Sequence, residues 1–286
     1  MKARLIISID LELAWGYWDC LTAEHLRMAE AAERPICAAL IELFDRFEVP
    51  ATWAIVAALL DEKSANSRPG NLECWHAPDI VERVLKAKVR HEIGSHSGKH
   101  VYFDEITAPQ AREDLDYMIA VHRAHGLSLR SFVYPRNVIG HLDLLAQAGV
   151  RSFRGSDLGW VRFVGKAGRV AGRAANLVDQ IFPVPPPPIT AEECGTLVNL
   201  RGSMLLMGRN GARRFVLPAV SRKKLRAGID RARRCGGIFH LWFHPSNFYY
   251  RTDEQLNTLA WFLDHAATEA SNGRLEIRTM GSFAAD

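Results

Sequence analysis

Apolar and polar positions follow two recurring patterns along the chain. Short runs rich in β-branched and aromatic residues, bounded by Gly, Pro and polar residues, are typical of buried strands. Longer stretches between them place apolar residues three and four positions apart, the spacing of a helix that packs one face against a sheet. We expect strands at 5–13, 49–56, 91–95, 129–134, 151–154, 237–243 and 275–279. We expect helices at 36–47, 78–89, 107–125, 140–148, 221–235 and 253–270.

The limits of the helices carry their own signals. Pro78 suits the first turn of a helix, where proline's missing N–H is not needed. Gly149 follows its helix as a C-terminal cap, and Ser221 is the expected N-cap of the basic helix. Strand and helix alternate about seven times, which predicts parallel strands joined by helical crossovers, in a barrel or a doubly wound sheet.

Titratable and aromatic residues recur where the predicted strands end. In parallel α/β folds the functional site lies at the carboxyl ends of the strands, where the loops begin. Residues of this kind follow five strands: Asp10 and Glu12, then 95–100, 134–137, 157–160 and 240–245. We therefore expect these segments to meet at one end of the fold.

The first and third strand ends together suggest a metal site. Asp10 and Glu12 are two residues apart on a strand, so they share one face, and one carboxylate can bind a metal while the other acts as a base. His96 and His100 share a face if the strand end turns into a helix. Two imidazoles and one carboxylate leave coordination positions open, as in a catalytic zinc site. Such a metal would lower the pKa of bound water and polarise a carbonyl.

The order of these motifs resembles the NodB-homology polysaccharide deacetylases, carbohydrate esterase family 4. That family has an acidic first motif, then H-[ST]-x-x-H, a Pro-centred motif, a motif with Asp and Trp, and L-x-x-H. The matching residues here are Asp10, His96-Ser97-Gly98-Lys99-His100, Tyr134-Pro135-Arg136, 157–160 and Leu241-Trp242-Phe243-His244. The segments 49–53 and 275–280 are also similar to the family. The resemblance spans nearly the whole chain.

The resemblance implies a fold and a set of roles. The fold is an α/β distorted (β/α)7-type barrel, NodB-like, as a single catalytic domain over 1–286 with a basic insertion around 161–200. The activity is metal-dependent deacylation, with zinc as the favoured divalent metal. Asp10 is the base, Glu12 joins His96 and His100 on the metal, and His244 protonates the leaving amine. The remaining roles are the backbone N–H of Arg136 on the oxyanion, Asp157 orienting His244, and Pro135, Trp160 and Leu241 in substrate binding.

The chain also departs from the family pattern. Leu11 follows Asp10 where two adjacent aspartates are commonest, and the D-x-E variant occurs in ureide hydrolases that work without the metal. The family's third-motif arginine is replaced by Val133, and Arg136 is our candidate to take over its role. We assign His240, the other histidine near the seventh strand end, a structural role.

Charge is distributed unevenly. The formal net charge is +4, but 151–235 holds 17 basic and 5 acidic residues, a net +12, and the rest is net −8. The segment 161–182 alternates basic with apolar residues, and 221–235 is a strongly basic helix. Such segments can lie on an anionic membrane or bind a phosphate-bearing substrate. We do not expect nucleic acid, because no nucleic-acid-binding motif accompanies the charge.

Composition and targeting signals narrow the class of protein. With 48% hydrophobic and 24% charged residues, the chain is not intrinsically disordered. It has no apolar run of about 18 residues that could span a membrane. The first apolar run is too short for a signal peptide, and five scattered cysteines without a C-x-x-C pair suit a reducing compartment. We expect a cytoplasmic protein, acting in part at the inner membrane face.

We therefore predict an N-deacetylase that acts on an N-acetylated sugar, an intermediate of polysaccharide or glycolipid biosynthesis linked to a phosphate, nucleotide or lipid. One alternative is a metal-free hydrolase of cyclic amides (ureides) on the same fold. The other is a catalytically silent barrel that binds glycan.

Overall fold

The computed structural model describes residues 2–157, 178–179, 182 and 184–283. Trp160 and most of the basic segment 161–182 lie outside the described residues. The strands are β1 (Ala3–Leu11), β2 (Thr52–Ile55), β3 (Glu92–Ser95), β4 (Ser131–Val133), β5 (Ser152–Arg154), β6 (Glu192–Cys194), β7 (Leu197–Asn199), β8 (Met204–Leu205), β9 (Ile238–Phe243) and β10 (Leu275–Arg278).

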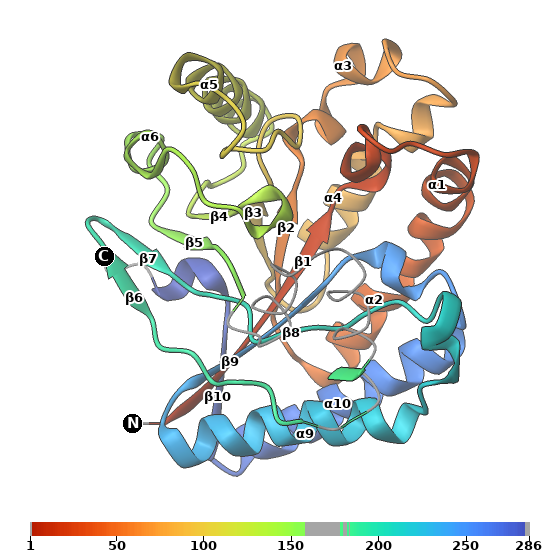
Figure 1. Ribbon diagram of the computed structural model, residues 1–286, viewed down its shortest axis with the longest axis vertical. Helices are drawn as coiled ribbons and strands as arrows, with labels where there is room; N and C mark the ends of the chain where they lie inside the picture. The colour runs from red at the N-terminus through yellow and green to blue at the C-terminus, as the bar shows by residue number, and fades with distance from the viewer. Residues whose placement is uncertain (1, 158–177, 180–181, 183, 284–286) are drawn as a thin grey trace.

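The ten strands form one sheet in the order β6-β7-β5-β4-β3-β2-β1-β9-β8, with β10 paired to the first half of β1. All neighbours run parallel except the β6–β7 hairpin. The sheet curls into a half-barrel whose outside is covered by helices (Figure 1). The predicted NodB-like α/β barrel class is confirmed.

Helices cover the outer face of this sheet. They are α1 (Ala23–Arg27), α2 (Glu33–Phe47), α3 (Glu62–Asn66), α4 (Pro78–Leu85), α5 (Ala108–Ala124), α6 (Leu142–Gln147), α9 (Pro218–Cys235) and α10 (Thr252–Ser271). Single turns are η1 (Leu13–Tyr17), η2 (Met28–Ala32), η3 (Ala57–Leu60), η4 (Leu72–Cys74), η5 (Pro135–Asn137), η6 (Gly211–Phe215), η7 (Pro245–Phe248) and η8 (Met280–Phe283). In Figure 1, α9 and α10 pack side by side along the lower edge, and α5 and α6 lie beside β3 to β5.

The alternation of side chains along each strand separates the core from the site. On β1, Ile7 and Ile9 pack outward into the main core with α2, α9 and α10. Ile6 belongs to a small cluster inside the curl, and because successive side chains point to opposite faces, Ser8 and Asp10 face the same interior. The inside of the half-barrel is thus apolar at one end and polar at the carboxyl end of β1.

Two local predictions are wrong. Helix α9 begins at Pro218, because proline suits the first turn, and Ser221 lies buried inside the helix as an acceptor for Arg209 (3.0 Å). The segment after β3 does not become a helix, since Ser97 and His100 have positive φ angles of 69° and 58°.

Among the described residues, no helix is both long enough and apolar enough to cross a membrane.

Candidate active site

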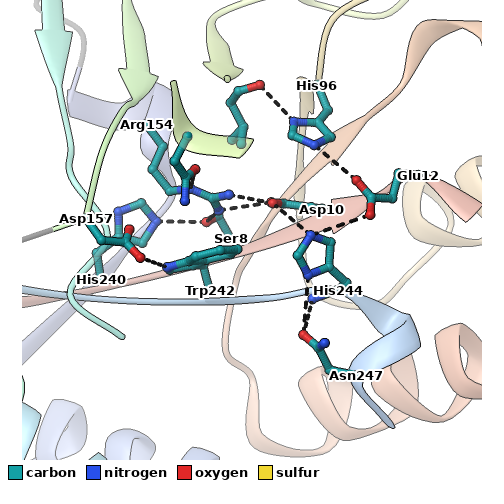
Figure 2. A network of polar contacts seen from close by, with 12 residues as sticks. Ser8, Asp10, Glu12, His96, Arg154, Asp157, His240, Trp242, His244 and Asn247 are labelled. Carbon is teal, nitrogen blue, oxygen red and sulfur yellow. Dashed lines mark hydrogen bonds and ion pairs between the residues drawn. The ribbon is translucent and has the colours of Figure 1, made fainter. Parts of the chain in front are cut away.

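The polar ends of four strands meet in one buried cluster (Figure 2). Asp10 stands on β1, and Glu12 follows that strand directly. His96 follows β3, Arg154 ends β5, and His244 follows β9. Because β1 pairs in parallel with both β2 and β9, the carboxyl ends of these strands lie at the same edge of the sheet. The predicted convergence of Asp10, Glu12, His96 and His244 is therefore found.

Glu12, His96 and His100 form a candidate metal site. Glu12 Oε2 lies 3.2 Å from His96 Nε2 and 3.0 Å from His100 Nε2. All three side chains are buried, and one ligand atom from each lies within 4.8 Å of the others. Donors that share a tetrahedral cation at bond lengths of ~2.0–2.1 Å stand about 3.3 Å apart. Both the donor set and its spacing therefore fit a divalent cation.

The backbone fixes the orientation of one histidine in this group. His96 Nδ1 lies 2.8 Å from the carbonyl oxygen of Val133. A carbonyl oxygen can only accept, so Nδ1 carries a proton, and Nε2 is the ring nitrogen that faces Glu12 and is left for a metal. Val133 stands where the family has its arginine, and here its main chain, not its side chain, supports the site.

Gly16 makes room for the Glu12 side chain. The turn η1 folds back over Glu12, and the Trp15 N–H donates to the Glu12 carbonyl (3.0 Å). A Cβ placed on Gly16 would lie 2.1 Å from Glu12 Oε1, closer than any real contact. Any larger residue at 16 must displace the predicted ligand. Sequence reasoning did not single out this glycine.

Asp10 is held by Arg154, which sequence reasoning missed. Arg154 donates from Nη1 to Asp10 Oδ1 (2.9 Å) and from Nη2 to Oδ2 (2.5 Å), and both side chains are almost fully buried. Burial raises the pKa of Asp10, but attraction to Arg154 and, to a smaller extent, to His96 outweighs it, so the pKa lies below its usual value. Asp10 is therefore a carboxylate with a fixed orientation.

Arg136 does not occupy the place that we expected. Its guanidinium pairs with Asp19 and lies 4.0 Å above the Tyr102 ring, partly exposed at the rim. Arg154 from β5 binds both oxygens of Asp10, whereas the Arg136 side chain pairs with Asp19 and does not reach Asp10 in the contacts described. Pro135 starts the turn η5 and is buried. The role of the Arg136 backbone N–H in holding an oxyanion stays a prediction.

His244 lies on the accessible side of the cluster. Its Nε2 is 3.6 Å from both Asp10 Oδ2 and Glu12 Oε1. The His244 side chain is 22% exposed, whereas the two carboxylates are nearly buried. Asn247 Oδ1 accepts from the His244 backbone N–H (2.9 Å) and lies 3.4 Å from its Nδ1. His244 is thus placed to exchange a proton with a ligand that enters from solvent.

Asp157 and Leu241, which the resemblance assigns to the site, make other contacts in the structure. Asp157 Oδ2 accepts from Trp242 Nε1 (3.2 Å), and the Trp242 ring packs edge-on against His244 (5.6 Å between centroids). Asp157 is thus connected to His244 through the indole, and Asn247 is the residue whose Oδ1 lies next to the imidazole. Leu241 points to the outer face of β9 and is fully buried in the main core, so we do not retain it as a substrate-binding residue.

His240 lies beneath the site and supports Arg154. Arg154 Nη1 donates to Ser8 Oγ (2.7 Å), so the Ser8 hydroxyl donates in turn to His240 Nε2 (2.8 Å). His240 Nδ1 then donates to the carbonyl oxygen of Leu200 (2.9 Å). Burial lowers the pKa of His240 to about 3, which agrees with a neutral ring in this chain of hydrogen bonds.

Known proteins resemble this chain in part of the sequence and in the fold. The family model for polysaccharide deacetylases matches residues 29–151. No curated protein matches the chain.

Solved structures share the fold at low sequence identity. A Pseudomonas aeruginosa PAO1 protein assigned as a polysaccharide deacetylase is 15% identical, with a TM-score of 0.64, over 99% of this chain and 90% of that one. A Mycobacterium smegmatis protein with the same assignment is 17% identical, with a TM-score of 0.60, over 97% of this chain and 93% of that one. The allantoinase PuuE is 14% identical, with a TM-score of 0.64, over 99% and 89%.

The family model covers residues 29–151, less than half of the chain, and the solved structures share its fold, so the chain resembles the NodB-homology polysaccharide deacetylases.

Proposed function

We propose that the protein is a metal-dependent N-deacetylase that releases acetate from an N-acetylated sugar. The observation that carries this proposal is that a possible metal site and a pair of possible proton-transfer residues lie side by side. Glu12, His96 and His100 form a donor set for a divalent cation. Asp10 and His244, a fixed carboxylate and an accessible imidazole, lie directly beside that set.

The donor set would hold the cation through Glu12 Oε2 and the two Nε2 atoms, with zinc as the favoured ion. A cation held there would supply Lewis acidity to the amide carbonyl and make the attacking water more acidic.

Asp10 and His244 would move the protons. Asp10, ionised and oriented by Arg154, accepts a proton from the attacking water. His244 Nε2 is 3.6 Å from that carboxylate, on the accessible side of the cluster, and gives a proton to the departing amine. The backbone N–H of Arg136 would hold the oxyanion, and Trp160 would line the acyl pocket.

The substrate that we propose is a biosynthetic intermediate linked to a phosphate, nucleotide or lipid, met in the cytoplasm at the inner membrane face. The net +12 of residues 151–235 supports an anionic group on the substrate or beside it. The test is acetate release from a matched pair of substrates, an N-acetylated sugar with and without a phosphate at its anomeric carbon. A lower KM for the phosphorylated sugar supports the proposal. Equal KM values that do not change with salt would show that the protein does not recognise an anionic group on the substrate.

A metal-free cyclic-amide hydrolase is the second candidate, because Glu12 Oε2 lies within hydrogen-bond distance of both histidines. Protonated histidines could hold Glu12 in this position without a cation. Turnover of a cyclic ureide by metal-stripped protein would select it. A silent glycan-binding barrel is disfavoured, because Asp10, His96, His100 and His244 are all present and meet.

A further inference from the structure

The two most exposed large apolar side chains of the described chain lie in one turn. Phe215 is 73% exposed and Leu217 is 66% exposed, while Val216 between them is buried. Phe215 ends η6, and Leu217 caps the amino end of α9. Val216 therefore anchors a turn that presents its two neighbours to solvent. We call Phe215 and Leu217 the apolar tip.

Basic groups surround the apolar tip. The Arg214 guanidinium lies 4.8 Å above the Phe215 ring, and Arg251 Nη1 donates to the Arg214 carbonyl oxygen (2.9 Å). Lys223 and Arg226 are exposed on the first turns of α9. The only acid of α9, Asp230, lies further along the helix and pairs with Arg226 and Arg233. The charged residues on the first turns of α9 are all basic, whereas Arg251 beside the tip pairs with Glu254 (3.0 Å).

The apolar tip lies on the same side of the molecule as the candidate active site. The chain that leads to it passes Gly208, where a Cβ would lie 3.1 Å from the carbonyl oxygen of Asn247, the residue that contacts His244. Phe215 lies seven positions after Gly208, a distance of at most about 25 Å. Gly208 and Arg213, the latter two residues before Phe215, line a cavity of about 170 Å³ together with Asn247.

We propose that the apolar tip inserts into the headgroup region of a bilayer rich in anionic lipid, while Arg214 and Lys223 contact lipid phosphates. Exposed apolar side chains with flanking cations are the elements of interfacial membrane binding. Two protruding side chains are too small for a stable protein interface, which buries about 1,200–2,000 Å². Charge complementarity therefore selects the anionic membrane as the partner. Delivery of a lipid-linked sugar to the site would follow only if the proposed deacetylase function holds; the membrane contact does not depend on it.

The test is co-sedimentation of the full chain with vesicles of phosphatidylcholine alone or mixed with phosphatidylglycerol. We expect binding to the mixed vesicles, weakened by salt. Phe215→Ser and Leu217→Ser should each lower the partition coefficient by about tenfold, and Arg214→Gln should lower it to a smaller extent. The matched control is Leu85→Ser, since Leu85 is 57% exposed but lies at the end of α4, before β3, away from the carboxyl ends of the strands.

Circular dichroism of each variant, and its turnover of a water-soluble substrate, separate membrane contact from folding and from activity. Two vesicle-binding results would overturn the proposal. One is equal binding of the wild-type protein to both kinds of vesicle, or to neither. The other is a loss in Leu85→Ser as large as in Phe215→Ser. If Phe215→Ser instead dissociates a dimer in sedimentation velocity, without changing vesicle binding, the tip is a contact between copies and the proposal is wrong.

Discussion

Arg154 binds both carboxylate oxygens of Asp10 across 144 positions of sequence, from β5, which β4, β3 and β2 separate from β1 in the sheet. The pair is buried, and the guanidinium also lies 4.2 Å above the Trp242 ring. Ser8 Oγ accepts from the same guanidinium and donates in turn to His240. The orientation of the proposed base is therefore set by a buried network that belongs to β1, β5 and β9 together.

Removing one partner of this pair should cost more than removing both. Arg154→Met leaves the Asp10 carboxylate buried without its cation, and we expect a loss of about 3–5 kcal/mol in the free energy of unfolding. The Asp10→Asn/Arg154→Met double variant should recover part of that loss, because no charge is left unpaired. Urea denaturation of both variants measures the difference. Equal losses would show that the pair is not a coupled unit.

A methyl group at Gly16 should weaken metal binding. Gly16→Ala places a Cβ on the Glu12 carboxylate, so Glu12 must leave its position beside the two histidines. We expect metal affinity to fall by about 10–100-fold, measured by competition with a chromogenic chelator. Gly126→Ala is the control, since nothing lies within 4 Å of its added Cβ. With its positive φ it should cost about 1 kcal/mol of stability without any change in metal affinity. An unchanged affinity in Gly16→Ala would contradict the assignment of Glu12.

Stability should fall in acid because of His240. The ring is neutral in the folded protein, with its pKa lowered to about 3, whereas it takes up a proton near pH 6.5 when unfolded. Between these values the unfolded state binds more protons, so the contribution is complete above pH 6.5 and declines as pH falls. The expected decline is about 1.4 kcal/mol per pH unit at its steepest. His240→Gln should lack this component, and the difference between the two unfolding curves against pH isolates it. A flat difference curve would show that His240 is not held neutral.

His244 and His96 should fail in different ways. His244→Ala removes the proposed acid but no metal ligand, so kcat should drop by about 10²–10⁴-fold while metal content is kept. His96→Ala should lose both metal and activity. Turnover and metal analysis on the same preparations check this. If His244→Ala also lost the metal, the division between acid and ligands would be wrong.

The sequence predicts the elements well, because hydrophobic period and turn residues are local signals. It also identifies Asp10, Glu12, His96 and His100, since all four lie at or shortly after the end of a recognisable strand. Arg154 was missed because β5 is only three residues long, although Ser152-Phe153-Arg154 places an arginine on the inner face. The same alternation places Leu241 in the core, where a motif match had made it a substrate contact.

Contacts made through the backbone or through other residues could not be predicted. The support of His96 by the carbonyl of Val133 does not depend on the residue type at 133. His96 and His100 converge through left-handed backbone at Ser97 and His100, which no helical spacing reveals. Asp157 lies at the expected strand end, but its partner, Trp242, comes from a strand 85 positions away.

Metal dependence of acetate release tests the central claim most directly. Protein stripped of metal would be titrated with Zn²⁺ while acetate release from an N-acetylated sugar is followed. The proposed mechanism predicts no turnover before addition and a plateau at one equivalent per chain, with no recovery in His96→Ala or His100→Ala. Full turnover by the stripped protein would contradict it.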